Sequence, residues 1–456
     1  MLHRQIRTEL LQALQAAKGL TLYRGIMEDP VCRAMLVFLE KVTGQAPMEQ
    51  ILDSYGEIFR LLSAKAVLAG EMPVGDAWQD YLLNLILYQD NPFSEAAASI
   101  PYGQLGRSLK QAAAWDLNKL QVLHRVEAGA VLASLLKMEK ESLAGQLPVW
   151  DALHIVGETG RDGRPKARAL KELLSGRDDW SACLEALADY YSCAGSGIFG
   201  RYGAFRWVSR HAHLEGIDEP DPVHLEQLIG YQSQRQEVVD NTEKFLAGLP
   251  ANNVLLYGDR GTGKSSTVKA LLNRYQARGL RLIEVPKSAL GDYPLIIRKL
   301  KGKPQLFILF VDDLSFEDSE VEYKELKAVL EGGLEVCPAN VLIYATSNRR
   351  HLVRERFSDR EPAGDEDGDL RIGDTVQEKL SLADRFGITV LFAMPDRLLY
   401  LDIVRGLAEQ RGIDIPGSEL ERKALLWEAW HNGRSGRTAR QFIDDLSGEL
   451  GSQKKQ

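Results

Sequence analysis

The first half of the chain repeats apolar residues at spacings of three and four, the period of amphipathic helices. The pattern is clear in TELLQALQAA, AWQDYLLNLILYQ and RVEAGAVLASLLKMEKESLAG. It breaks at SCAGSGIFGRYGAFRWVSRHAHL, where glycines and aromatic residues gather, and the proline-containing stretch GIDEPDPVHLEQLIGY follows. We therefore predict a mostly α-helical N-terminal domain over residues 1–215, with its boundary near residues 215–222.

From Asn253 onward, short apolar segments alternate with helical ones. The expected strands are NVLLYG, LRLIEV, LFILFVDDL, NVLIYATSN and ITVLFAMP. Strands that alternate with helices predict a parallel sheet covered on both faces. After Pro395 the pattern is purely helical. We therefore predict an α/β nucleotide-binding domain over residues 216–395 and a small helical lid over residues 396–456.

The stretch LLYGDRGTGKSST opens from an apolar strand onto glycines and leads into helix-forming residues. It fits the pattern GxxxxGK followed by Ser or Thr, in which loop N–H groups and a helix N-terminus hold phosphates. A glycine-rich turn without function is the alternative, but a strand and a helix lie where the motif requires them. The expected nucleotide contacts are Gly258, Asp259, Arg260, Gly261, Thr262, Gly263, Lys264, Ser265 and Ser266.

Two acids end the strongly apolar segment QLFILFVDDLSFED. In P-loop ATPases such acids hold magnesium and polarise the attacking water, so we expect Ser265 and Asp312 to hold Mg²⁺ and Asp313 to act on water. A helix cap is the common alternative for an acidic pair. Asp313 is one methylene shorter than the Glu usual at this position, which puts the hydrolysis rate in question. At the end of the next strand, Asn348 can position the attacking water.

The phosphate loop, the acid pair and the strand that ends at Asn348 are followed by LADRFG and SGRTARQF, and this is the order found in AAA+ ATPases. The region from about residue 222 to 450 therefore resembles an AAA+ ATPase. The resemblance implies ATP as ligand, Mg²⁺ as cofactor and catalytic roles for Lys264, Asp313 and Asn348. It also implies that Arg385 acts as an arginine finger, reaching the γ-phosphate bound by a neighbouring subunit. A surface ion pair with a nearby acid is the alternative for this arginine.

The lid and the segment before the phosphate loop complete the resemblance. Arg440 in GRTARQF resembles the sensor 2 arginine of AAA+ lids, and Arg437, one helical turn earlier, is the alternative. For both arginines, the alternative without function is a solvated, basic first turn of a helix. Ile229, with the following glycine and Tyr231, resembles the segment that packs on adenine.

The acid pair and DRFG look closest to the initiator and helicase-loader branch of AAA+ proteins. More narrowly, FVDDLSFE, YATSNRRHL and DTVQEKLSLADRFG resemble an uncharacterised bacterial family known as a domain of unknown function. The resemblance implies a homo-oligomeric ATPase that remodels or loads a macromolecular partner, a protein or a protein–DNA complex. An ATP-gated switch with little hydrolysis is the alternative. A small-molecule kinase fits less well, because LADRFG and SGRTARQF suggest a site shared between subunits.

Composition narrows the remaining possibilities. The net charge of −8 gives no overall attraction to nucleic acid or to an anionic membrane. The four cysteines show no zinc spacing, His211 and His213 are weak metal candidates, and no apolar run approaches a membrane span. We therefore expect a cytoplasmic protein without a membrane partner. The basic segment 161–171 reads as a solvated helix start, and the acidic loop 361–369 is hypothesised to cross to a neighbouring subunit.

Overall fold

The computed structural model describes residues 2–66, 73–127, 148–150, 165–315, 337–348, 385–431 and 433–453, with a few single positions between them. The chain forms two compact units, Met1–Arg201 and Tyr202–Gln456. No helix among these described residues is both long enough and apolar enough to cross a membrane.

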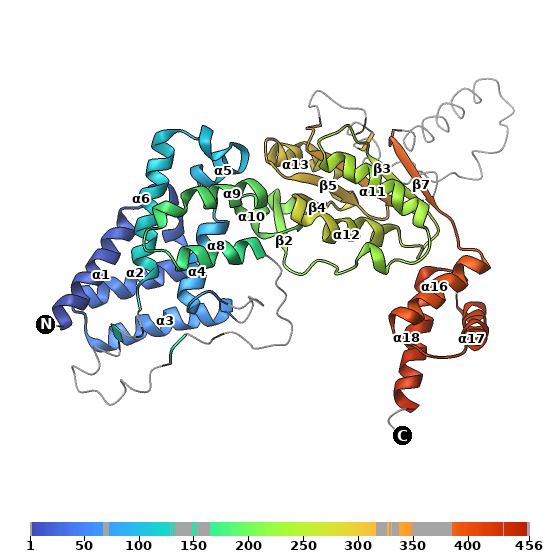
Figure 1. The fold of residues 1–456 in the computed structure, drawn as a ribbon, viewed down its shortest axis with the longest axis horizontal. Coiled ribbons are helices and arrows are strands. Elements are labelled where there is room, and N and C mark those ends of the chain that lie inside the picture. The colour runs from blue at the N-terminus through green and yellow to red at the C-terminus, as the bar shows by residue number, and fades with distance from the viewer. Residues whose placement is uncertain are drawn as a thin grey trace. The chain divides into compact units, whose positions relative to one another are not determined.

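The N-terminal unit is built from helices throughout its described residues, as the sequence predicts (Figure 1). Local caps set where some of them begin: the Asp29 carboxylate accepts hydrogen bonds at the start of α2, and Asp76 forms a capping box with Gln79 at α4. The α-helices are α1 (Leu2–Lys18), α2 (Pro30–Thr43), α3 (Met48–Ala66), α4 (Ala77–Tyr88), α5 (Pro92–Ser99), α6 (Arg107–His124), α8 (Pro165–Ser175), α9 (Leu184–Ala194) and α10 (Gly197–Arg201).

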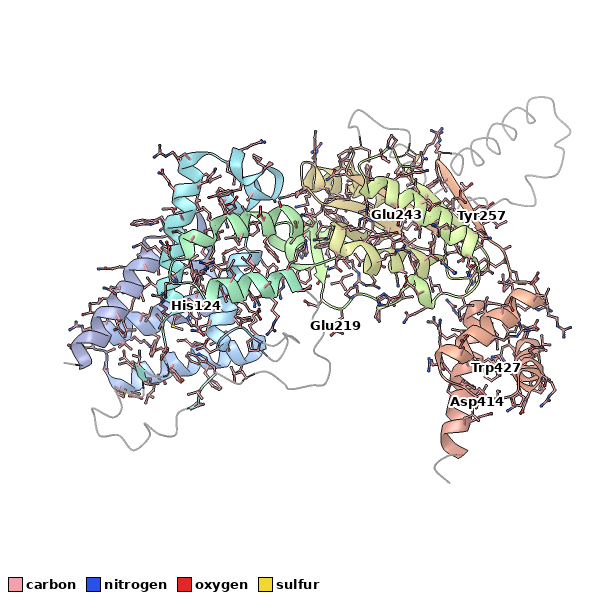
Figure 2. The ribbon with its side chains drawn as sticks, viewed as in Figure 1. His124, Glu219, Glu243, Tyr257, Asp414 and Trp427 are labelled. Atoms are coloured by element: carbon pink, nitrogen blue, oxygen red, sulfur yellow. The ribbon has the colours of Figure 1, made fainter. Side chains whose placement is uncertain are left out.

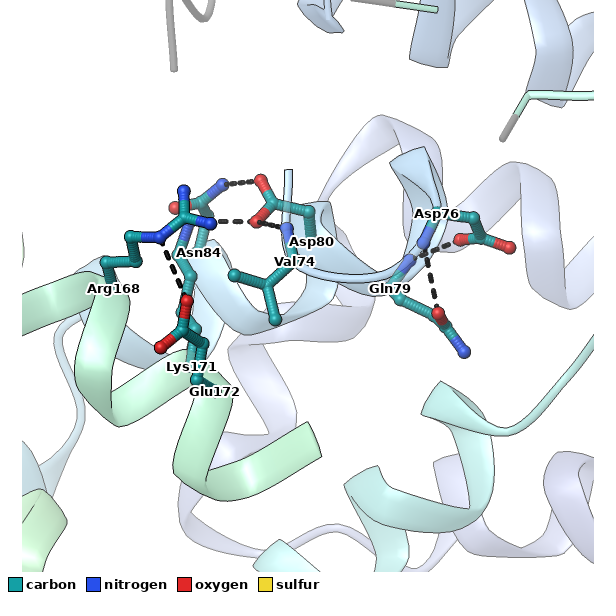
Figure 3. A network of polar contacts seen from close by, with 8 residues as sticks. All are labelled: Val74, Asp76, Gln79, Asp80, Asn84, Arg168, Lys171 and Glu172. Carbon is teal, nitrogen blue, oxygen red and sulfur yellow. Dashed lines mark hydrogen bonds and ion pairs between the residues drawn. The ribbon is translucent and has the colours of Figure 1, made fainter. Parts of the chain in front are cut away.

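A buried ion pair joins α8 to α4 in this unit. Lys171 is 5% exposed, and its Nζ donates to Asp80 Oδ1 at 3.0 Å. The same carboxylate accepts from the Val74 N–H and from Asn84 Nδ2, both at 2.9 Å (Figure 3). Removing one partner of such a pair leaves a buried charge without compensation, which is costly. The pair therefore fixes how α8 packs on α4.

The C-terminal unit contains a sheet, its covering helices and a helical lid. Its strands are β1 (Ala204–Val208), β2 (His213–Ile217), β3 (Val254–Gly258), β4 (Leu280–Glu284), β5 (Leu306–Val311), β6 (Val341–Ser347) and β7 (Ile388–Phe392). Its α-helices are α11 (Gln232–Leu246), α12 (Lys264–Tyr275), α13 (Tyr293–Leu300), α16 (Arg397–Gln410), α17 (Gly417–Trp430) and α18 (Gly436–Gln453). The strands β3 to β7 coincide with the apolar segments expected from the sequence.

The strand order is β2-β1-β4-β5-β6-β3-β7, and every neighbouring pair is parallel except β1 with β2. The chain crosses from β3 to β4 in one direction and returns from β4 to β5. Right-handed crossovers therefore place α12 and α13 on opposite faces (Figure 1). Every residue of β6 is buried, which explains its nearly continuous apolar sequence.

A hairpin of β1 and β2 extends the sheet beyond β4, and the sequence analysis did not anticipate it. Phe205 and Trp207 are buried while Arg206 between them is exposed, the alternation of a half-buried strand. Trp207 Nε1 also donates to Asp292 Oδ2 at 2.8 Å. The second unit consequently begins at Tyr202, before the boundary expected near residues 215–222, because this aromatic segment is a sheet edge rather than a junction.

His124, at the end of α6, gives the N-terminal unit a predicted pH dependence (Figure 2). Burial, helped by the charge of Arg125, lowers the pKa of His124 to about 4, and its ring packs edge-on against Trp180. As the pH falls below about 6.5, the unfolded chain takes up a proton that the folded chain does not, so stability decreases. From pH 7 to pH 5 we expect the free energy of unfolding to fall by about 2 kcal/mol through this group.

Urea unfolding of the full chain at the two pH values measures this loss. His124→Phe keeps an aromatic ring but cannot take up a proton, so it should remove that part of the pH dependence. An equal loss in His124→Phe and in the unsubstituted protein would contradict the assignment.

Candidate functional site

The loop between β3 and α12 is shaped by glycines. Gly258 has φ of 132°, and a Cβ there would lie 2.1 Å from the Phe392 carbonyl oxygen of β7. Gly263 has φ of 95° with no heavy atom within 4 Å of its Cβ position, so the loop is open at this point. The close approach of β7 and the open bend before α12 both require glycine.

Lys264, the first residue of α12, turns its side chain back over this loop. Its Nζ donates to the Gly258 and Asp259 carbonyl oxygens at 2.8 and 2.6 Å and to Asn348 Oδ1 at 3.1 Å. The residue is 6% exposed, and burial lowers the pKa of its ammonium group while the nearby Asp side chains oppose that shift. A buried cation supplied only with neutral oxygens at hydrogen-bond distance is ready to exchange them for an anion.

The acid that ends β5 meets two hydroxyl groups. Asp312 Oδ1 accepts from Ser265 Oγ at 2.6 Å and from Thr346 Oγ1 at 2.5 Å. A hydroxyl and a carboxylate in contact at a helix N-terminus form the hard-oxygen donor set that suits Mg²⁺. The predicted pair Ser265 and Asp312 therefore fits a magnesium ion.

The second acid is held by its backbone and by its side chain. Asp313 has φ of 51°, a left-handed conformation, and its N–H donates to Thr346 Oγ1 at 2.9 Å. Asn348 Nδ2 donates to Asp313 Oδ1 at 2.5 Å. Asn348 also accepts from Lys264, so the hydrogen bonds run from Lys264 to Ser265, and the peptide bond between these two neighbours completes a ring. The ring contains the predicted residues Lys264, Ser265, Asp312, Asp313 and Asn348.

Thr346 is the member of this ring that the sequence analysis did not single out. It lies two residues before Asn348 in the segment ATSN, and alternate residues of a strand point to the same side. That spacing is the signal by which it could have been found. Its position at the carboxyl end of β6 places its hydroxyl between Asp312 and the Asp313 N–H.

The segment expected to pack on adenine lies where the sheet meets the lid. Tyr231 has φ of 53°, its hydroxyl donates to the Ala393 carbonyl oxygen at 2.6 Å, and its ring centroid lies 5.3 Å from that of Phe392. Ile229 packs on α16, since a Cβ on Gly406 would lie 2.6 Å from its Cδ1. Tyr231 therefore borders the connection from β7 to α16, and Ile229 packs on α16 itself.

That connection is also tied to the phosphate loop. Asp259 N–H donates to the Phe392 carbonyl oxygen at 3.0 Å, and the Met394 N–H donates to Asp259 Oδ2 at 2.7 Å. Thr262 is buried and donates to the Asp259 carbonyl oxygen at 2.9 Å. Arg260 is exposed, and Ser266 is half-buried on α12. Asp259 thus links the loop to β7 and to the connection that leads into the lid, by contacts that the sequence analysis did not specify.

The two lid arginines lie in different surroundings. The Arg437 N–H donates to the Gly261 carbonyl oxygen at 3.2 Å, so the start of α18 touches the phosphate loop. Arg440 is exposed and lines a pocket formed by α16, α18 and the turn that contains Gln227. The structure therefore brings Arg437, the alternative, against the loop, whereas Arg440, favoured by the sequence analysis, lines that pocket.

Arg385 is half-buried three residues before β7 begins at Ile388. The acidic loop 361–369, with its hypothesised crossing to a neighbouring subunit, lies outside the described residues. Arg385 is the first described residue of the segment that leads into β7. Its predicted role as an arginine finger stays a prediction.

The remaining candidates stand apart from this site. The rings of His211 and His213 are 5.9 Å apart and exposed, and the described residues contain no cluster of His, Cys, Asp and Glu fit to hold a metal ion. In the basic segment 161–171, Arg168 pairs with Glu172 at 2.9 Å on the surface, and Lys171 is buried against α4. Residues 161–164 lie outside the described part of the chain.

Comparisons relate this chain to several known proteins. The family model described as "Protein of unknown function (DUF815)" matches residues 200–450. The 26S proteasome regulatory subunit 6B homolog of Dictyostelium discoideum is 25% identical over 235 residues, 44% of this chain and 58% of that protein. The proteasome-activating nucleotidase of Methanocaldococcus jannaschii is 26% identical over 213 residues, 40% of this chain and 50% of that protein. The chain spans about half the length of these curated relatives.

Among solved structures, the Thermotoga maritima RuvB Holliday junction branch migration motor aligns with a TM-score of 0.36 and 17% identity, covering 51% of this chain and 67% of that chain. The region matched by the family model contains the β1–β2 hairpin, the phosphate loop, both acids and most of the lid. That region is more than half of the 456 residues. The chain therefore belongs to the DUF815 family.

Proposed function

We propose that this protein binds ATP with Mg²⁺ at the carboxyl ends of β3, β5 and β6 and hydrolyses it to ADP and phosphate. The observation that carries the proposal is the series of hydrogen bonds that runs from Lys264 through Asn348, both acids and Thr346 to Ser265, the chain neighbour of Lys264. A structural core has no need for a lysine, two carboxylates and an amide at one sheet edge. Phosphate chemistry needs each of them.

The chain's own residues would hold the phosphates through the loop. The N–H groups of the phosphate loop and the N-terminus of α12 favour an anion, and Lys264 would leave its carbonyl partners for phosphate oxygens. Ser265 and Asp312 would hold Mg²⁺, which supplies charge neutralisation at the phosphates when bound. Ile229 and Tyr231 would border the adenine beside the lid.

Hydrolysis needs a group that orients water, and Asp313 is the proposed one. Its left-handed backbone and its contact with Asn348 fix the carboxylate at the edge of the site. Asn348 in turn contacts Lys264, so the residue proposed to orient water is coupled to the residue proposed to contact phosphate. This arrangement supplies orientation, the main contribution a protein makes to phosphoryl transfer.

A second function, an ATP-gated switch with little hydrolysis, is favoured by one observation. In this structure Asn348 engages an oxygen of Asp313, which is already one methylene shorter than Glu. A carboxylate held in this way is a weaker partner for water. Tight ATP binding with slow single-turnover hydrolysis would identify the switch.

The assembly and the partner are also proposed. Arg385 would complete the site of a neighbouring copy, which makes the protein a homo-oligomer, and the N-terminal helical unit would recognise a macromolecular partner. Support comes from the resemblance of the chain to AAA+ ATPases, because members of that superfamily usually assemble. The curated relatives named as proteasome regulatory subunits and nucleotidases are consistent with remodelling of a protein partner.

Lys264→Ala should abolish measurable ATP binding, because the loop loses its only buried ammonium group among the described residues and its contact to Asn348. We expect the Kd for ATP to rise by about 100-fold or more, as for the loss of a charge-assisted contact in a desolvated site. Equilibrium binding of ATP to the full chain measures the effect.

Lys269→Ala is the matched control, since Lys269 lies on the same helix and forms only a surface ion pair with Asp221 at 3.5 Å. Its Kd should stay within about twofold of the unsubstituted value. Equal ATP affinity in Lys264→Ala and in the unsubstituted protein would reject the proposed site.

The lid arginines give a second matched pair. We propose that Arg437, which begins α18 against Gly261, contacts the phosphates, and that Arg440 does not. Arg437→Ala should lower kcat/KM for ATP by about tenfold or more, whereas Arg440→Ala should change it by less than about threefold. Steady-state ATP turnover of the two variants decides between them. The reverse order of effects would return the role to Arg440.

A further inference from the structure

One hydroxyl group touches both acids of the candidate site. Thr346 Oγ1 donates to Asp312 Oδ1 at 2.5 Å and accepts from the Asp313 N–H at 2.9 Å. The residue lies on β6, whereas both acids follow β5, so the contact crosses between paired strands. A second tie comes from its own carbonyl oxygen, which accepts from the Leu314 N–H at 2.7 Å.

We infer that Thr346 is a positioning residue that sets the geometry of both acids at once. Its single hydroxyl hydrogen is directed at the Asp312 carboxylate, and its lone pair then receives the Asp313 N–H. Thr346 is 1% exposed, so its hydroxyl lies largely shielded from solvent at the base of the two exposed acids. The inference rests on the proposed function, because the two acids are the groups proposed for Mg²⁺ and for water.

The Asp313 backbone explains why such a tie is needed. A left-handed conformation at a residue other than glycine costs of order 1–3 kcal/mol unless its surroundings hold it. The Thr346 hydroxyl accepts the Asp313 N–H, and the Leu314 N–H that follows is also bound to β6. These bonds hold the turn that directs the Asp313 side chain toward Asn348.

The same hydroxyl constrains Asp312. Ser265 and Thr346 both donate to Asp312 Oδ1, and these two hydrogen bonds restrict rotation of the carboxylate about χ2. Bound Mg²⁺ would take over the contact with Ser265, so Thr346 would remain as the donor that orients Asp312. Partners that orient metal-binding carboxylates typically change metal affinity or activity by 10- to 100-fold when they are removed.

The test compares Thr346→Val, which keeps the shape and loses the hydroxyl, with Thr346→Ser, which keeps the hydroxyl. Thr242→Val is the control for loss of a buried hydroxyl in the same unit, since Thr242 is 0% exposed and bonds to Val238 and Tyr344 instead. The full chain is titrated with Mg²⁺ at a fixed concentration of ribose-labelled fluorescent ATP, and binding is also measured in EDTA. Turnover at saturating Mg²⁺ gives kcat and KM.

For Thr346→Val we expect the Mg²⁺ midpoint of nucleotide binding to rise by about tenfold and kcat to fall by about 10- to 100-fold. Affinity in EDTA should stay within about twofold, because the loop and Lys264 are untouched. Thr346→Ser should restore the midpoint and kcat, and Thr242→Val should leave both unchanged. A general loss of packing would instead affect the two valine variants alike.

An unchanged Mg²⁺ midpoint and kcat in Thr346→Val, with ATP still bound by the unsubstituted protein, would overturn the inference and leave the proposed function standing. Absence of ATP binding by the unsubstituted protein would overturn both. The binding titration therefore separates the two failures without relying on turnover.

Discussion

Because β5, β6 and β3 pair in parallel, their carboxyl ends lie at the same edge of the sheet. This common edge brings the polar residues of the candidate site together. The register pairs Val311 with Ala345 and Tyr257 with Ser347, which sets Asp312 beside Thr346 and the phosphate loop beside Asn348. Ligand sites in open α/β sheets form at this edge for the same reason. The neighbouring strand β7 then reaches the loop, where its close approach leaves no room for a side chain at Gly258.

The ring of contacts at this edge links charge, metal-type oxygens and backbone strain. Lys264 is buried and donates to carbonyl and amide oxygens, the exposed Asp312 accepts from two hydroxyls, and Asp313 lies in a left-handed turn. The hydrogen bonds between these residues reduce the cost of burying the lysine and of holding the strained turn. Asp259 extends the ring to the connection that leads into the lid. Nucleotide state and lid position are therefore proposed to be coupled through the phosphate loop.

Much of this could be predicted from the sequence, because buried parallel strands give apolar runs and the phosphate loop has a specific pattern. The hairpin of β1 and β2 was missed because its strands are short and follow directly on a segment rich in Gly and aromatic residues, a composition also typical of junctions. Thr346 was missed because its role depends on pairing between β5 and β6, which no local pattern encodes. The choice between Arg437 and Arg440 depends on how the lid docks, and one helical turn separates them in sequence.

ATP turnover per chain, measured over a wide range of protein concentration with Lys264→Ala as the blank, tests the central claim most directly. The account predicts turnover that exceeds the blank and rises with concentration, because Arg385 of a neighbouring copy would complete each site. Turnover that never exceeds the blank at any concentration would contradict it.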